Sequence, residues 1–405
     1  MKGEPTMDFR FRDDVESFRA EVRAFFASEM APDRTNEHSD PADLTGLDEG
    51  FERQLHARCG DRGYLGLTVE PSMGGLGRTI SYQATFNFEA AACGAPTIDT
   101  AMTLAGHPIV DYGSAAQKEF FLPRMLSGEI EMCIAYTEEA AGSDLGAIAT
   151  VATPTDDGFV LNGTKVLVTG AHKADWCCTV ARTRPDGKPR DGMSMFLVDM
   201  RAPGVGAVRR STMNEWTLGE IHFADVHVST AAVLGELNGG WRQLVSAVQA
   251  ERSGMFYFGF ATEVFALLVD FVRCGTRDGR PLAGDAIVRD RVAELHVDLQ
   301  AGLRLAKRTL WMQERGESNT VQASMTKVYA TEFLQRLAHT ATEIAGLAGA
   351  LHGPLFGPPP PYAAGRGRFA WEYLERVHGT ISVGNNELQR DGIAQFGLGL
   401  PRPRR

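Results

Sequence analysis

Apolar residues recur at helical spacing in the first third of this 405-residue chain. Val15, Phe18 and Val22 illustrate the spacing, and Ala31-Pro32 is a typical end for the helix that contains them. These patterns predict an N-terminal helical domain at residues 1–131. Four further helices are predicted in it, at about 47–60, 80–93, 99–112 and 115–127.

The pattern changes in the middle of the chain to short runs of β-branched and aromatic residues. Such runs, separated by Gly-containing turns, predict a small β-barrel or sandwich at residues 132–237. The expected strands lie at 159–161, 165–168, 176–181, 194–198 and 221–223. The expected turns are Asp157-Gly158, Asn162-Gly163, Asp186-Gly187 and Asp191-Gly192.

Helical spacing returns from Asn238 and predicts a C-terminal bundle domain at residues 238–405. Trp241 and Leu244 lead into a long apolar helix that is expected to include position 251. The expected fold class is therefore α+β, with an N-terminal helical domain, a central β-domain and a C-terminal four-helix bundle. Further helices are expected at about 287–315, 322–351 (ended by Gly353-Pro354) and 365–396.

Composition is that of an ordinary soluble protein, with 43% hydrophobic and 23% charged residues. The formal net charge of −10 argues against a nucleic-acid partner. We find no secretory leader and no apolar run of membrane-spanning length. The six cysteines lack C-x-x-C spacing and the histidines lack metal spacing, so we expect reduced thiols, no metal site and a cytoplasmic location.

The segment Tyr136-Thr-Glu-Glu-Ala-Ala-Gly-Ser-Asp144 combines hydroxyls with a Gly-containing turn. Such a turn forms a cradle of hydroxyl and backbone N–H groups that suits a flavin ring or its phosphates. Leu161-Asn-Gly-Thr-Lys165 follows and leads to Thr169. These two segments resemble the TEPxxGSD and NGxKxWIT motifs of the acyl-CoA dehydrogenase family. The resemblance extends to the end of the chain, where Gly397-Leu-Gly-Leu-Pro-Arg402 is similar to that family's closing LGLPR.

The resemblance implies FAD-dependent α,β-dehydrogenation of an acyl-CoA or other acyl thioester. The product is the trans-2-enoyl thioester, a hydride passes to flavin N5, and an electron-transfer flavoprotein or similar acceptor receives the electrons. Leu167 stands where the family often has a Trp beside the flavin. The implied flavin contacts are Tyr136, Thr137, Gly142, Ser143, Leu167, Thr169, Asn385 and Glu387, and the implied substrate contacts are Ser143, Arg252 and Gly384.

The reaction needs a base for the α-proton, and a carboxylate in an apolar pocket suits this role because desolvation raises its pKa. Most of the family places this Glu in a Y-E-G-T-x-E-x-Q-R segment, but the matching Ile381–Arg390 has Val383 at that position. A minority branch, including the isovaleryl and long-chain enzymes, places the Glu on the long helix, which corresponds to Glu251. The alternatives are a surface Glu251 paired with an Arg, and His378 as the base.

The residues that one subunit of the family donates to its neighbour's flavin are altered here. Arg277 is out of register, Glu343 replaces a Gln and Leu347 replaces a Gly. A carboxylate at Glu343 would repel a phosphate. This pattern resembles the heterotetrameric acyl-CoA dehydrogenases of steroid side-chain breakdown, in which two unlike chains build each flavin site. Sequence drift within a homo-oligomer is the alternative.

Other functions are compatible with the same fold. They are an acyl-carrier-protein dehydrogenase of secondary metabolism, a flavin monooxygenase or nitroalkane-type oxidase, and a non-catalytic partner subunit of a heteromeric dehydrogenase. Ser324-x-x-Lys327 has the spacing of a serine acylase motif but lies within a predicted helix without the accompanying motifs. We interpret it as a helix-packing sequence.

Overall fold

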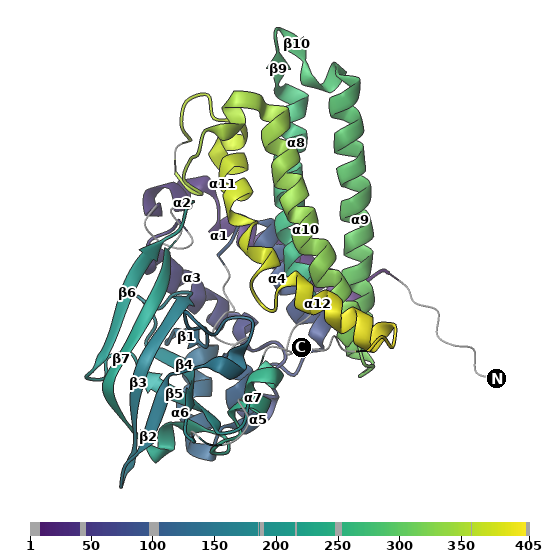
Figure 1. Cartoon of the computed structure of the whole chain (residues 1–405). Coiled ribbons are helices and arrows are strands. Elements are labelled where there is room, and N and C mark those ends of the chain that lie inside the picture. The colour runs from purple at the N-terminus through teal and green to yellow at the C-terminus, as the bar shows by residue number, and fades with distance from the viewer. Residues whose placement is uncertain are drawn as a thin grey trace, which may run out of the picture. The chain divides into compact units, whose positions relative to one another are not determined.

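The computed structural model describes residues 9–40, 46–96, 105–184, 186, 190–214, 217–247, 253–357 and 359–401. They form two compact units. The helical unit comprises the described parts of Met1–Ser39, Arg78–Thr97 and Glu251–Arg405, and the sheet unit those of Asp40–Gly77 and Ile98–Ala250. Helical segments with a central sheet confirm the predicted α+β class (Figure 1).

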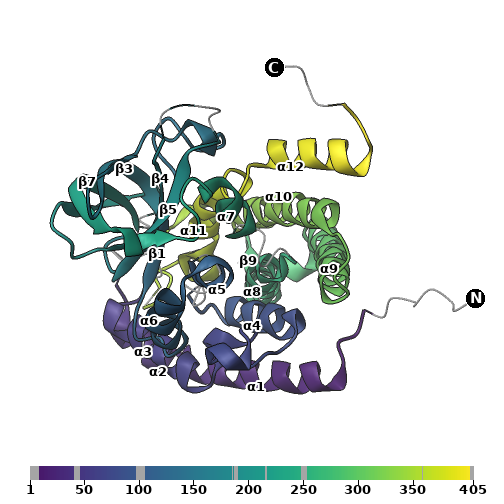
Figure 2. The ribbon, with the colours of Figure 1, turned by 90° about the horizontal axis from the view of Figure 1, so that it is seen from below.

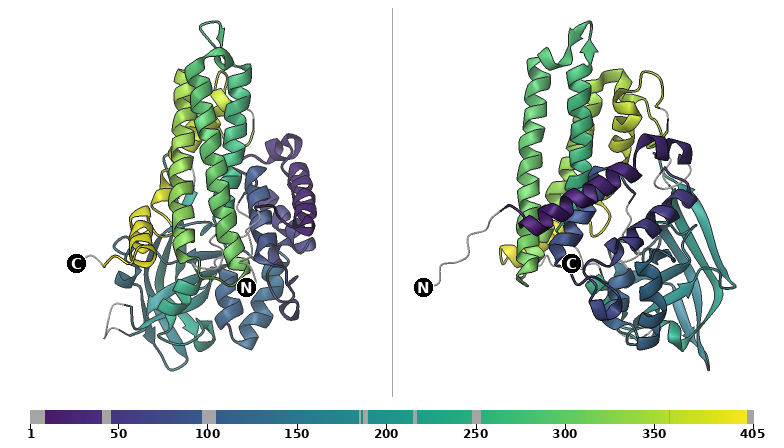
Figure 3. Two further views of the ribbon diagram at one scale, coloured as in Figure 1. Left: turned by 90° about the vertical axis from the view of Figure 1, so that its right-hand side faces the viewer. Right: turned by 180° about the vertical axis from the view of Figure 1, so that it is seen from behind.

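Three long helices dominate the helical unit and run side by side (Figures 2 and 3). They are α8 (Met255–Cys274), α9 (Ala286–Glu314) and α10 (Thr320–Ala345). The predicted helix at 287–315 is therefore confirmed. A short hairpin joins α8 to α9 and contains β9 (Thr276–Arg277) and β10 (Arg280–Pro281). The remaining helices of this unit are α1 (Asp13–Glu29), α2 (Pro32–Thr35), α4 (Ile80–Ala92), α11 (Arg368–Glu375) and α12 (Asn386–Gly392).

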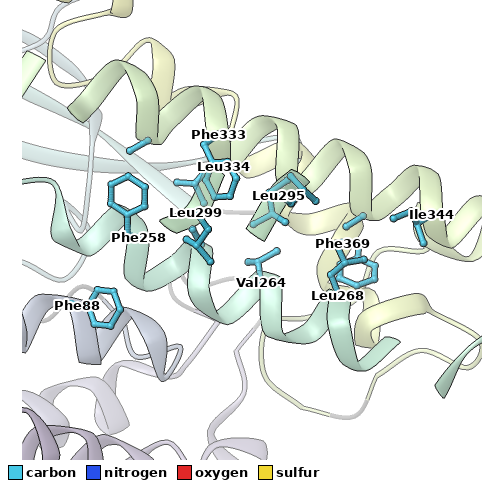
Figure 4. Close-up of a cluster of buried hydrophobic side chains, with 14 of the residues drawn as sticks. Phe88, Phe258, Val264, Leu268, Leu295, Leu299, Phe333, Leu334, Ile344 and Phe369 are labelled. Atoms are coloured by element: carbon cyan, nitrogen blue, oxygen red, sulfur yellow. The ribbon is translucent and has the colours of Figure 1, made fainter. Parts of the chain in front are cut away.

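The core of the helical unit is apolar and lies between these helices. Val264 and Leu268 of α8 face Leu295 and Leu299 of α9, and Leu334 of α10 completes the layer (Figure 4). By length and composition α8 is apolar enough to cross a membrane. Its side chains Phe258, Val264 and Leu268 nevertheless belong to this core, as expected for the central helix of a bundle.

Two buried ion pairs fix the outer helices of this unit. Glu89 of α4, with a 1% exposed side chain, accepts hydrogen bonds from Arg19 and Arg23 of α1 at 2.5 and 2.8 Å. Arg368 of α11 reaches Glu263 of α8 at 2.9 Å. Because a buried charge is costly without a partner, these contacts restrict where α1 and α11 can lie.

Three helix predictions for this unit are corrected. The helix predicted at 322–351 ends at Ala345, because Gly346 has a φ of 63° and a 3₁₀ turn follows. The helix predicted at 365–396 is broken into α11 and α12 by residues 376–385, which include a 3₁₀ turn at His378–Thr380. The apolar helix predicted from Trp241 is interrupted, since Gly254 has a φ of 72° and α8 starts only at Met255. The stop at Ala31-Pro32 is confirmed, with α1 ending at Glu29.

An eight-stranded sheet forms the centre of the sheet unit. The order of its strands is β6-β7-β3-β2-β4-β5-β8, and β1 pairs with β4 in parallel. The strands at 159–161, 165–168, 176–181, 194–198 and 221–223 are confirmed, and β1, β2, β6 and β8 were not predicted. The strands are β1 (Met132–Ala135), β2 (Val151–Pro154), β3 (Gly158–Val168), β4 (Trp176–Arg182), β5 (Met193–Asp199), β6 (Val205–Ser211), β7 (Thr217–Ser229) and β8 (Val233–Leu234).

Helices of the sheet unit pack against β1, β4 and β5 through a second apolar core. Phe121 packs edge-on against Trp176 of β4, with ring centroids 4.9 Å apart. The predicted helices at 47–60, 115–127 and, in the other unit, 80–93 are confirmed. Of the helix predicted at 99–112, residues 105–112 are described, and α5 covers His107–Tyr112. The helices of the sheet unit are α3 (Glu49–Asp61), α5 (His107–Tyr112), α6 (Ala115–Leu126) and α7 (Gly240–Ala247).

The turn predicted at Asn162-Gly163 is wrong. Both residues lie inside β3, which continues to pair with β7 across an irregularity between Leu161 and Gly163. The Asn162 amide donates to the Asp225 carboxylate and accepts the Asp225 N–H, both at 3.0 Å, so the bulge is fixed from β7. The turns at Asp157-Gly158 and Asp191-Gly192 are confirmed, and Gly187 lies outside the described residues.

Candidate functional site

The predicted cradle begins where β1 ends. Tyr136 is buried, and its hydroxyl lies 3.8 Å from the sulfur of Cys178. Burial raises the pKa of this phenol. The side chain is therefore part of the domain core, and Tyr136 can reach a ligand only through its main chain.

Glu138 and Lys165 form a buried ion pair that joins the two motifs of the cradle. Lys165 Nζ lies 2.7 Å from Glu138 Oε1 and also donates to the Val180 carbonyl at 2.8 Å. Glu138 accepts the backbone N–H groups of Ala149 and Thr150 at 2.5 and 3.0 Å. Burial opposes ionisation of the carboxylate, but Lys165 and these donors outweigh it and lower the pKa of Glu138.

This ion pair and one main-chain hydrogen bond together hold the two motifs of the cradle. The Val166 N–H donates to the Thr137 carbonyl at 2.9 Å, so the TEE segment and the end of β3 lie together. Sequence reasoning missed Glu138 as an organising residue. A signal was present, because Lys165 leads into the apolar run Val166-Leu-Val168 and a buried Lys needs an acidic partner.

The outer side of the cradle is open. Gly142, Ser143, Leu167 and Thr169 are exposed, and a Cβ added to Gly142 would have no atom within 4 Å. Leu167 is 66% exposed and has a φ of 57°. An exposed apolar side chain beside hydroxyls and free space fits a group that has both a flat aromatic ring and polar edges, as a flavin has. The residues of the sheet unit therefore fit the implied FAD.

The second predicted segment belongs to the helical unit and contains a strained turn. Val383 and Gly384 are both left-handed, with φ values of 54° and 76°. Asn385 follows and caps α12, because its side-chain oxygen accepts the Leu388 N–H at 2.8 Å. Glu387 is exposed in the first turn of that helix. Val383, at the position of the usual base, is 62% exposed and has no group that accepts a proton.

Glu251 and Arg252 lie outside the described residues, so their predicted roles stay predictions. The long helix begins four residues after Glu251, contrary to the expectation that this helix includes position 251. The described residues that follow are apolar and enclosed: Met255 is 2% exposed and Phe258 is fully buried.

His378 is held by its own helix turn. Its Nδ1 lies 2.7 Å from the Glu375 carbonyl oxygen and 3.1 Å from the Glu375 carboxylate. The hydrogen bond that His378 donates to Glu375 raises the pKa of His378 and favours the imidazolium. The Nδ1 atom is therefore engaged within its own turn, and this contact does not favour His378 as the base.

Two of the altered half-site residues, Arg277 and Glu343, make contacts within this chain. Arg277 of the α8–α9 hairpin donates to the Ile344 carbonyl near the end of α10 at 2.5 Å. Glu343 forms an ion pair with Arg291 of α9 and lies 3.2 Å from His339 Nε2. Leu347 is 94% exposed. Cys274 is also exposed here, and none of the six cysteines is in a disulfide.

Comparison with known proteins gives a consistent result along the chain. Models of the acyl-CoA dehydrogenase N-terminal, middle and C-terminal domains match residues 12–129, 133–226 and 238–398. The acyl-CoA dehydrogenase FadE26 of Mycobacterium tuberculosis is 30% identical, over 98% of this chain and all of that protein.

Two solved structures are similar over the same length. The steroid ACAD Tcur3481-Tcur3483 has a TM-score of 0.89 and 29% identity, covering 98% of this chain and 100% of that one. The ChsE4-ChsE5 complex from Mycobacterium tuberculosis has a TM-score of 0.87 and 29% identity, with the same coverage.

Proposed function

Because this chain belongs to the acyl-CoA dehydrogenase family and is an FAD-dependent oxidoreductase, we propose that it converts an acyl-CoA to the trans-2-enoyl-CoA with Glu251 as the base. The observation that carries this proposal is the intact cradle at 136–144 and 166–169 together with three matching domain models. When bound, FAD supplies the two-electron acceptor that a dehydrogenation needs.

We assign each step of proton handling to a residue of this chain. The carboxylate of Glu251 removes the α-proton, and the N–H of Gly384 donates to the thioester carbonyl, which makes that proton more acidic. Ser143 and Arg252 contact the substrate. Support for Glu251 comes from Val383, which cannot act as a base, and from the apolar residues after position 254.

Flavin bleaching by a panel of acyl thioesters tests this function. Short, branched, long-chain and steroid-like acyl-CoA substrates are added without oxygen, and the loss of oxidised flavin absorbance is followed for each. Bleaching by at least one CoA thioester supports the proposal. The steroid-like substrate belongs in the panel because one similar structure is a steroid ACAD.

Each alternative gives another outcome. The same acyl groups are also presented on an acyl-carrier protein, and bleaching only by these carrier-linked thioesters would show an acyl-carrier-protein dehydrogenase. Rapid reoxidation of the reduced flavin by oxygen would show a monooxygenase or oxidase. No bleaching by any thioester, with flavin bound, would show a non-catalytic partner subunit.

We further propose that the chain works in the cytoplasm as one subunit of a hetero-oligomer and passes electrons to an electron-transfer flavoprotein or a similar acceptor. The Arg291–Glu343 ion pair supports the assembly, because it places a carboxylate where the family resemblance expects a neutral amide. A related but unlike chain would then supply the phosphate donors that this chain lacks.

A further inference from the structure

The turn between α11 and α12 has an unfavourable backbone. Val383 and Gly384 are consecutive left-handed residues, and a β-branched side chain rarely adopts this conformation. Gly384 tolerates the positive φ, but a Cβ there would come within 2.8 Å of Gln389 Nε2. Such a turn persists only when its surroundings hold it.

Side chains of α10 and α12 hold this turn by its carbonyl groups. Lys327 Nζ donates to the Gly384 carbonyl at 3.0 Å and to Asn386 Oδ1 at 2.8 Å. Gln389 Nε2 donates to the carbonyls of Gly384 and Val383 at 3.2 and 3.4 Å. Ser324 in turn donates to Gln389 Oε1 at 2.7 Å.

Ser324 and Lys327 are one helical turn apart on α10 and are both buried. The interpretation of Ser324-x-x-Lys327 as packing alone is therefore incomplete, because both side chains reach the turn. Burial lowers the pKa of Lys327 to about 8, so the ammonium form donates at neutral pH.

Holding these carbonyls also sets the direction of one N–H group. The Val383 carbonyl and the Gly384 N–H belong to the same planar trans peptide and point in opposite directions. Gln389 Nε2 donates to the Val383 carbonyl of this peptide. Lys327 Nζ donates to the Gly384 carbonyl, which belongs to the next peptide. The Gly384 N–H therefore points away from Gln389, and Gly384 is exposed.

We propose that Lys327, together with Gln389, is a positioning residue that keeps the Gly384 N–H directed at the substrate's thioester carbonyl. This inference rests on the proposed function, since it concerns the donor assigned there to Gly384. Lys327 touches neither substrate nor reacting atoms in this proposal and acts only through the turn.

Carbonyl polarisation in a bound product tests the inference without turnover. The flavin-loaded protein, with its partner where one is needed, is mixed with trans-2-enoyl-CoA labelled with ¹³C at the thioester carbonyl. Difference infrared spectra then report the hydrogen bond to that carbonyl. We expect a lowered stretching frequency in the wild type and a smaller shift in Lys327→Met, which keeps the apolar stem but removes the donor.

Kinetics supply the second measurement. With the best substrate of the panel, Lys327→Met should lower kcat by about 10- to 100-fold, the scale of a small misplacement of a catalytic group. KM should change little, because most of the substrate's contacts remain. The matched control is Lys307→Met on α9, whose Nζ donates to the Phe9 carbonyl away from the turn. It should alter neither the spectrum nor kcat.

The outcomes separate this inference from the function itself. If the wild type shows no carbonyl shift and no flavin bleaching, the proposed function fails. If the wild type shows both and Lys327→Met retains both, the positioning role is wrong. Should Lys327→Met not fold, Gln389→Leu gives the same two readings, and unchanged values there would overturn the inference.

Discussion

At the scale of single residues, Val383 combines two unfavourable properties. Its side chain cannot accept a proton, and its left-handed backbone costs about 1–3 kcal/mol relative to an allowed conformation. In the proposed reaction this turn supplies the Gly384 N–H as a hydrogen-bond donor but no base, so we expect the base elsewhere in the chain.

We expect Glu251→Gln to retain FAD but to reduce flavin bleaching by at least ~10²-fold, the usual scale of general-base catalysis. The amide keeps the size of the side chain but cannot take the α-proton. Stopped-flow absorbance with the best substrate measures the effect. His378→Gln serves as the comparison and should remain near the wild-type rate. The assignment is wrong if the two variants behave in the opposite way.

The buried Glu138–Lys165 pair makes stability depend on pH. Because the folded state lowers the pKa of Glu138, its stabilisation is complete above the unfolded pKa of about 4.3 and is lost as the pH falls through the folded value. Glu138→Gln leaves Lys165 buried without a counter-ion and should cost about 3–5 kcal/mol at pH 7.

Urea unfolding at pH 7 and at pH 4 measures this effect. The wild type should lose part of its stability at the lower pH, and Glu138→Gln should lose less. The neighbouring Glu139→Gln is exposed and should stay within about 0.5 kcal/mol of the wild type. Equal pH dependence in all three proteins would contradict the assignment to Glu138.

At the scale of elements, the bulge in β3 depends on Gly163. A Cβ at this position would lie 2.5 Å from Thr150 Oγ1 and 2.8 Å from Thr150 Cα, and the main-chain atom cannot move cheaply. We expect Gly163→Ala to lower the free energy of unfolding by about 1–3 kcal/mol, as overpacking does. Gly206→Ala, on the same sheet with no atom within 4 Å, is the control and should have little effect. An equal loss in both would attribute the effect to strand glycines in general.

The elements show which features a single sequence reveals. Apolar spacing predicted α9 closely, because that helix keeps one period and starts at a capping Asp285. The helix predicted at 365–396 was carried through 376–385 although Gly384-Asn385 is a typical break, and a left-handed Val has no sequence signal. Asn162-Gly163 is typical of a tight turn, but pairing of β3 with β7 on both sides overrides that local preference.

The candidate site also has residues that the sequence predicted and contacts that it did not. Local motifs predicted the exposed Gly142, Ser143 and Thr169. The contacts behind the site were not predicted: Glu138 with Lys165 supports the cradle and Lys327 with Gly384 holds the turn, and they join residues 27 and 57 positions apart. No periodicity encodes such pairs, so only the folded chain reveals them.

At the scale of the whole molecule, the internal contacts of Arg277 and Glu343 predict that FAD binding depends on a partner chain. Alone, the chain should hold less than one FAD per chain, because Arg277 and Glu343 are engaged within it. Co-expression with an unlike homologous chain should restore one FAD per pair. Native mass spectrometry with flavin absorbance measures both quantities. A stable homotetramer of this chain alone with four tightly bound FAD molecules would contradict the heteromeric assembly.

The cysteines give this molecule a natural attachment point for a probe. Cys59, Cys133, Cys177 and Cys178 are buried, and burial raises the pKa of Cys93 to about 11, so these thiols react slowly. Cys274 alone is exposed, and it lies three residues before Arg277. A maleimide dye would therefore label the native chain beside the half-site without any engineered mutation. Its fluorescence would follow the arrival of a partner in real time.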